Sequence, residues 1–93
     1  MPDPAPGEPH AHRLKRLAMR SMRRGIKEMD LILSAYADAR LGGMGEADLA
    51  LYGALLNEND HDLYQWVTGQ GDVPAPYAAL VADIQATLAR AGG

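Results

Sequence analysis

The chain has 93 residues, no cysteine and a formal net charge of −3 at pH 7. This length suits one domain with one hydrophobic core, and the lack of cysteine excludes disulfides and thiolate metal sites. No apolar run approaches the roughly 20 residues that span a bilayer, and the first residues lack the hydrophobic segment of a secretory signal, so we expect no membrane insertion.

The charged residues are distributed unevenly along the chain. Residues 1–27 contain seven of the nine Lys and Arg residues but only two of the twelve acidic residues. Residues 28–93 therefore carry a net charge of −8. A basic first segment joined to an acidic body favours oriented, salt-sensitive docking on a charged partner.

The first residues differ in composition from the rest. Residues 1–12 contain four prolines and no large apolar side chain beyond Met1. Because proline lacks a backbone donor and the segment has little to bury, we predict a disordered, proline-rich tail over 1–12. A single helical-bundle domain is predicted over 13–93.

The first helix is predicted over 13–23, where leucines and Met22 follow helical spacing on one side and arginines on another. Gly25 is expected to take the left-handed conformation that ends this helix, because glycine alone accepts a positive φ without a Cβ clash. The second helix is predicted over 26–41, before a pair of glycines.

Three further helices are predicted over 46–56, 61–68 and 76–91. Asp60 is expected to cap the fourth helix, and Trp66 is expected in the core because it shares an apolar stripe with its neighbours. No useful length of chain alternates with the period of a strand. The predicted fold is therefore all-α, a compact antiparallel bundle of about five short helices.

The most informative stretch is the junction between the first two predicted helices. It contains the six candidate partner-binding residues: Arg23, Arg24, Gly25, Ile26, Lys27 and Glu28. A glycine without side-chain bulk, flanked by cations and one carboxylate, suits close docking against a larger partner. The alternative is an ordinary helix end where Glu28 pairs with Arg24 or Arg23, a surface contact worth about 0–1 kcal/mol.

The sequence offers little support for catalysis or metal binding. The serine and threonine hydroxyls have no histidine near them in the sequence, and Asp60, His61 and Asp62 would point around a helix start rather than toward one ion. No glycine-rich phosphate loop follows a strand. We therefore predict a protein that is not an enzyme and that binds no metal.

A nucleic-acid-binding helical regulator is the alternative function. Its phosphate contacts would come from the basic first helix and the junction, through Arg13, Arg16, Arg20, Arg23, Arg24 and Lys27. However, the acidic body would repel a polyanion, and no aromatic residue is interleaved with these cations for base stacking. We therefore expect no nucleic-acid partner.

Several blocks of the chain are typical of one known family. The junction reads R-G-x-x-E at Arg24–Glu28 and is extended by Met29-Asp30. Similar blocks follow at Leu55-Leu56, Asp60, Asp62-Leu63-Tyr64, Trp66, Pro74, Leu80, Val81, Ile84 and Gln85. Over residues 13–90 the sequence thus resembles the SdhE-type flavinylation and assembly factors of succinate dehydrogenase.

The resemblance implies a five-helix bundle that promotes covalent attachment of FAD to the flavoprotein subunit of succinate dehydrogenase. That subunit is the expected partner, with the flavoprotein of fumarate reductase as a second candidate. The family joins FAD to a histidine of the client, so no cofactor is expected to stay bound to this chain. Arg24, Gly25 and Glu28 match the family's functional residues, with Ile26 and Lys27 between them. We expect a monomer when free and, without an obvious transit peptide, a bacterial cytoplasmic location.

Overall fold

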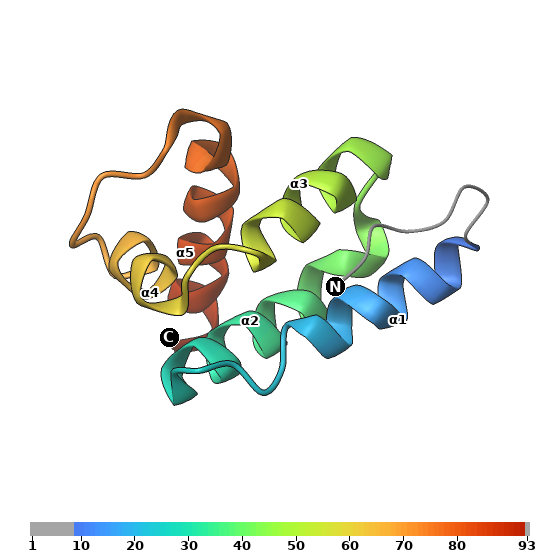
Figure 1. Cartoon of the computed structure of the whole chain (residues 1–93), viewed down its shortest axis with the longest axis horizontal. Coiled ribbons are helices and arrows are strands. Elements are labelled where there is room, and N and C mark those ends of the chain that lie inside the picture. The colour runs from blue at the N-terminus through green and yellow to red at the C-terminus, as the bar shows by residue number, and fades with distance from the viewer. Residues whose placement is uncertain (1–8, 93) are drawn as a thin grey trace.

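The computed structural model describes residues 9–92, and in this range the chain forms five α-helices, two 3-10 helices and no β-strand (Figure 1). The all-α class with five short helices is therefore confirmed. The α-helices are α1 (His10–Arg20), α2 (Lys27–Arg40), α3 (Glu46–Leu56), α4 (Asp60–Val67) and α5 (Ala78–Gly92), and the 3-10 helices are Leu41–Gly43 and Ala75–Tyr77.

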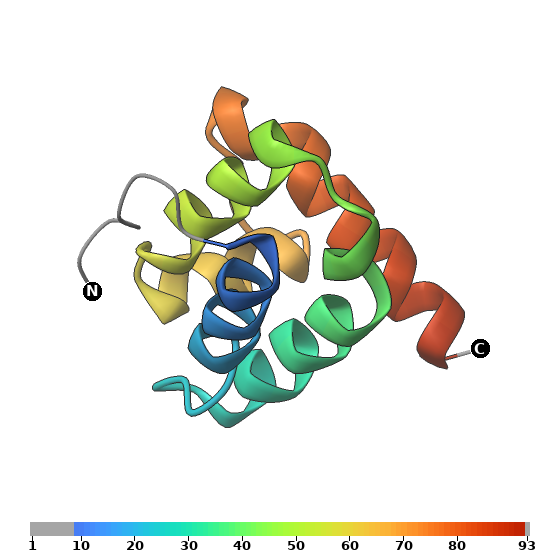
Figure 2. The ribbon, with the colours of Figure 1, turned by 90° about the vertical axis from the view of Figure 1, so that its right-hand side faces the viewer.

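Helix α2 is the centre of the arrangement. It lies antiparallel beside α1 and also contacts α4 and α5 (Figures 1 and 2). Helix α3 reverses the chain direction again, whereas α5 crosses α2 rather than running along it (Figure 1). The position of α2 follows from its sequence, because Met29, Leu33, Tyr36 and Ala37 follow helical spacing and are all buried.

The core receives apolar side chains from all five α-helices. Helices of 8 to 15 residues are marginal alone, so their shared core supplies most of their stability. Trp66 is buried, as predicted, and packs against the ring of Tyr77 at a centroid distance of 5.9 Å. The buried apolar residues are Leu17, Met29, Leu33, Tyr36, Ala37, Leu41, Leu49, Tyr52, Leu55, Leu56, Leu63, Trp66, Val67, Leu80, Val81 and Ile84.

The first helix differs most from its predicted position. It begins at His10, so residues 10–12, which were predicted to belong to the disordered tail, are helical, while residues 1–8 lie outside the described range. Pro9 occupies its N-cap, and proline is well tolerated at a helix start because its missing N–H has no partner there. The helix ends before Met22, which is 51% exposed rather than on the apolar side.

Two buried hydroxyl groups join α1 to α3. Ser21 Oγ donates a hydrogen bond to Leu17 O at 2.8 Å and lies 2.6 Å from the hydroxyl of Tyr52. Both residues are fully buried. Burial raises the pKa of Tyr52 to about 12, against an ordinary value of 10.0, because the ionised phenolate would lose its hydration.

This shifted pKa predicts a loss of stability at high pH. The unfolded chain releases the Tyr52 proton near pH 10 and the folded protein only near pH 12, so the free energy of unfolding should fall between these values by about 2–3 kcal/mol. In urea unfolding measured across this range, Tyr52→Phe should remove that part of the fall. Tyr64→Phe, at a half-exposed ring, is the control and should follow the wild type. An equal fall in both variants would contradict the prediction.

Candidate functional site

The six predicted partner-binding residues lie where the chain reverses between α1 and α2. Arg23–Ile26 belong to the connecting turn, and Lys27 and Glu28 begin α2 (Figure 1). We call residues 23–28 the corner. Arg23, Gly25, Lys27 and Glu28 are exposed, whereas Arg24 and Ile26 are half-buried.

The corner backbone differs from the prediction at one residue. Arg23, not Gly25, has the left-handed conformation, with φ of 56°. The Arg23 N–H donates a 2.6 Å hydrogen bond to Asp30 Oδ2, so the first turns of α2 hold this conformation in place. A left-handed residue with a Cβ costs about 1–2 kcal/mol. Gly25 is therefore not the helix-ending residue that its position in the sequence suggests.

Gly25 is instead required for a close approach to Asp60. Its N–H donates a 2.5 Å hydrogen bond to Asp60 Oδ2. A Cβ at this position would lie 3.2 Å from the same oxygen, which is tighter than an ordinary contact. The absent side chain thus lets the corner backbone reach the start of α4.

Arg24 binds the other oxygen of the same carboxylate. Its Nε and Nη2 lie 2.9 and 2.7 Å from Asp60 Oδ1, and its remaining donors reach Arg20 O at 2.9 Å and Leu56 O at 3.0 Å. The Arg24 and Asp60 side chains are only 13% and 15% exposed. We call this set of bonds from Arg24 and Gly25 to Asp60 the Asp60 clamp. Arg24 therefore supports the corner from within and does not pair with Glu28.

Asp60 is available for the clamp because another residue caps α4. Asn59, not Asp60, is the N-cap, and its Oδ1 accepts a 2.8 Å hydrogen bond from the N–H of His61. Asp60 then lies in the first turn, where the helix dipole also stabilises its negative charge. The sequence contained one signal that Asp60 is not the N-cap, because Asn59, also a good capping residue, immediately precedes it. It contained no signal that Asp60 would bind Arg24 and Gly25.

The outward side of the corner carries charges of both signs. The side chains of Arg23, Lys27 and Glu28 make no hydrogen bond or ion pair with any described residue. They flank Gly25 in the sequence, and Gly25 is itself exposed. Such a surface offers ion pairs and close backbone approach to a partner.

Much of the basic stripe on α1 is used inside the molecule. Arg13 pairs with Glu46, and Arg20 donates to Asn57 Oδ1 and, at 3.3 Å, to Gly53 O. With Arg24, three of the six cations proposed for phosphate binding thus connect α1 and the corner to α3 and α4. The arrangement weakens the nucleic-acid alternative, which needs these groups free.

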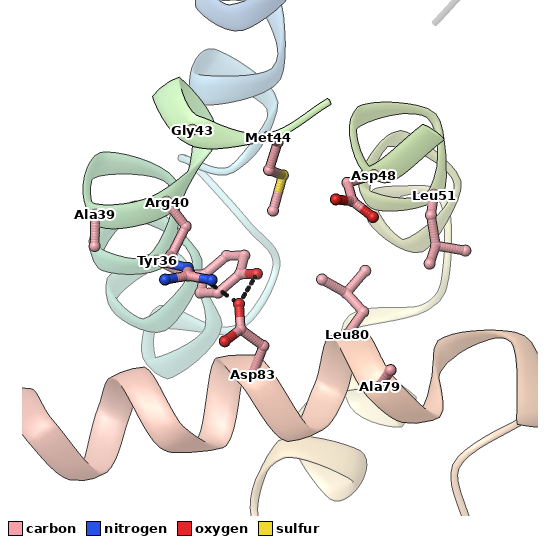
Figure 3. Close-up of a pocket in the computed structure, with 10 residues that line it drawn as sticks. All are labelled: Tyr36, Ala39, Arg40, Gly43, Met44, Asp48, Leu51, Ala79, Leu80 and Asp83. Carbon is pink, nitrogen blue, oxygen red and sulfur yellow. Dashed lines mark hydrogen bonds and ion pairs between the residues drawn. The ribbon is translucent and has the colours of Figure 1, made fainter. Parts of the chain in front are cut away.

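A separate pocket of about 320 Å³ lies between α2, α3 and α5 (Figure 3). Inside it Asp83 Oδ2 accepts hydrogen bonds from the Tyr36 hydroxyl at 2.7 Å and from Arg40 Nε at 3.2 Å. Burial, followed by the hydrogen bond to Asp83, raises the pKa of Tyr36. Asp48 faces this group across the pocket (Figure 3). The bonds from Tyr36 and Arg40 to Asp83 join α2 to α5. None of the corner residues lines the pocket.

No helix in residues 9–92 is both long and apolar enough to cross a membrane. Over the same part of the chain, no three histidine or acidic side chains are placed to hold a metal ion.

Residues 15–88 match the family model described as flavinator of succinate dehydrogenase. The match includes the whole corner and Asp60. This chain belongs to that family.

Three relatives show the extent of the similarity, and all are named mitochondrial succinate dehydrogenase assembly factor 2. The chain is 47% identical to that of Penicillium rubens over 62 residues, which are 67% of this chain and 20% of the relative. It is 37% identical to that of Drosophila grimshawi over 81 residues, 85% of this chain and 55% of the relative. It is 46% identical to that of Saccharomyces cerevisiae over 61 residues, 66% of this chain and 38% of the relative.

These names correct one expectation from the sequence. A bacterial cytoplasmic location was predicted because the chain has no obvious transit peptide, but the relatives are named as mitochondrial proteins of fungi and an insect, which overturns it. The matched region spans only a fifth to about half of these relatives' lengths.

The Asp60 clamp can be tested by replacing its carboxylate with an amide of the same shape. Asp60→Asn should lower the free energy of unfolding by about 1–3 kcal/mol, because the amide has no charge and keeps one acceptor oxygen where the carboxylate uses one for Arg24 and the other for Gly25. Urea unfolding measures the loss, and the NMR signal of the Gly25 amide should shift. The control is Asp62→Asn, which removes the same charge from an exposed residue in the same helical turn. Equal losses in both variants would mean that Asp60 acts only through the helix dipole.

Proposed function

We propose that this chain promotes covalent attachment of FAD to the flavoprotein subunit of succinate dehydrogenase by docking its corner on that subunit. Family membership and the assembly-factor names of its relatives support this proposal. The observation that carries it is the exposed Gly25, surrounded by charges without an internal partner and held by the Asp60 clamp. The flavoprotein of fumarate reductase is a second candidate client.

The proposed role is that of an adaptor and not an enzyme. The factor would bind as a monomer, and FAD would stay with the client. An adaptor shifts its client toward an attachment-competent conformation only if it binds that conformation more tightly than the others. The Asp60 clamp helps because a turn already fixed in the free protein loses less conformational entropy on binding.

In this proposal the R-G-x-x-E sequence has two tasks. Arg24 is held inside by Asp60, which supports a role in shaping the corner and not in contacting the client. Glu28 and Lys27 are exposed in the first turn of α2, where they can orient the client by charge. Gly25 has both tasks, since it reaches Asp60 on one side and leaves room for client backbone on the other.

Gly25→Arg should abolish flavin attachment while leaving a helical protein. The new Cβ would displace the Asp60 carboxylate by a few tenths of an ångström, and the long side chain would occupy the docking surface. Circular dichroism should report retained helix, and cells carrying only this variant should lack covalent flavin in the client. The control is Gly42→Arg, at an exposed glycine whose added Cβ meets no atom within 4 Å. Normal covalent flavin with Gly25→Arg would defeat the proposal.

Glu28→Ala should weaken client binding without changing the fold. Its carboxylate has no internal partner, so apart from a helix-dipole contribution of about 0.3–1 kcal/mol its loss should leave the free energy of unfolding unchanged. Affinity for the isolated flavoprotein subunit, measured by calorimetry, should fall about fivefold to twentyfold. Asp72→Ala, which removes an exposed carboxylate from the loop before α5, should bind like the wild type. Unchanged affinity in Glu28→Ala would argue against a docking role for this residue.

A further inference from the structure

The large apolar side chains that remain exposed are concentrated around the corner. Met19, Met22 and Leu31 are 61%, 51% and 63% exposed, and they are the exposed large hydrophobic residues among those described. They lie in α1, the turn and α2 within thirteen residues of sequence. Exposed apolar residues that gather in one place mark an interaction site more often than scattered ones do.

The cations without an internal partner lie in the same region. Lys15, Arg23 and Lys27 are exposed and their side chains make no hydrogen bond or ion pair with the described residues. The other Lys and Arg side chains all have partners within the molecule. The cations without an internal partner are therefore confined to α1 and the corner.

Four of these side chains, Lys15, Met19, Met22 and Leu31, lie along one surface over α1 and α2. Lys15 and Met19 line a hollow on the outer side of α1. Lys15 and Met22 line a groove of about 620 Å³ between α1 and α2, which extends to Ala35. Leu31 precedes Ala35 by one helical turn, so it continues the surface along α2. We call Lys15, Met19, Met22, Arg23, Lys27 and Leu31 the elbow face; the helices that carry it lie side by side in Figure 2.

We infer that the elbow face extends the docking surface of the corner, and that it binds an acidic surface of the flavoprotein subunit containing apolar recesses. This inference rests on the proposed function. Three unpaired cations require anions on the partner, and the methionine side chains adapt to recesses of irregular shape. The net charge of −8 on residues 28–93 turns the rest of the molecule away from an acidic partner.

The composition of the elbow face disfavours other occupants. Phosphates of a nucleic acid or a membrane would pair with the cations, but the acidic body would repel an extended polyanionic surface. In a symmetric contact, a second copy would bring the same excess of cations, Lys15, Arg23 and Lys27 against Glu28 and Asp38, so the two faces would carry a net charge of the same sign. An acidic protein surface with recesses matches both the charges and the exposed methionines.

Calorimetry with the isolated flavoprotein subunit tests the inference. Lys15→Glu should weaken binding about tenfold, because it places a carboxylate opposite acidic groups, and Met19→Ser should weaken it about fivefold by removing apolar area. Binding of Lys15→Glu should also depend less steeply on salt than that of the wild type. The control is Arg90→Glu, which changes the net charge equally at an exposed residue of α5 and should bind like the wild type.

The outcomes separate this inference from the proposed function. If Gly25→Arg abolishes binding but Lys15→Glu and Met19→Ser bind like Arg90→Glu, the elbow face is not part of the docking surface. The proposed docking role of the corner is then retained. If the wild type does not bind the flavoprotein at all, both are wrong. The inference that the elbow face binds a protein would be wrong if duplex RNA or phosphatidylglycerol vesicles bound more tightly than the flavoprotein and the same variants weakened that binding. It would also be wrong if sedimentation showed a dimer that Met19→Ser dissociates.

Discussion

The corner depends on one carboxylate. Asp60 accepts hydrogen bonds from the Arg24 guanidinium through one oxygen and from the Gly25 N–H through the other, across 36 and 35 residues of sequence. Charge-assisted hydrogen bonds of this kind are shorter and stronger than neutral ones, and the pair of Arg24 and Asp60 side chains is largely shielded from water. They hold the turn after α1 against the start of α4. The backbone at the corner is therefore fixed before any partner arrives.

This constraint explains why the R-G-x-x-E sequence contains residues of such different kinds. Arginine is needed because its planar fork of donors reaches Asp60, Arg20 O and Leu56 O simultaneously. Glycine is needed because a Cβ would crowd the carboxylate. Glu28 takes no part in these bonds and remains exposed at the start of α2. Internal support and external contact thus come from different residues of one short sequence.

The charge asymmetry of the chain has a similar explanation. Arginines on the inner side of α1 and at the corner bind acceptors on α3 and α4, whereas Lys15, Arg23 and Lys27 face outward without partners. The basic segment therefore both attaches α1 to the acidic body and leaves a cationic surface around the corner. Met19 and Met22 also lie exposed on that surface, so their apolar area remains in water and does not contribute to the hydrophobic core.

The sequence by itself determined the helices and the place of the corner. Apolar spacing located α2 to α5 within two residues and placed Trp66 in the core, because helical periodicity is a local property of the chain. Only the tertiary structure decided that Arg24 points inward and Arg23 outward, and that Arg23 rather than Gly25 is left-handed. No local sequence pattern distinguishes Arg23 from Arg24. Their roles differ because α4 brings Asp60 within reach of one guanidinium and not of the other.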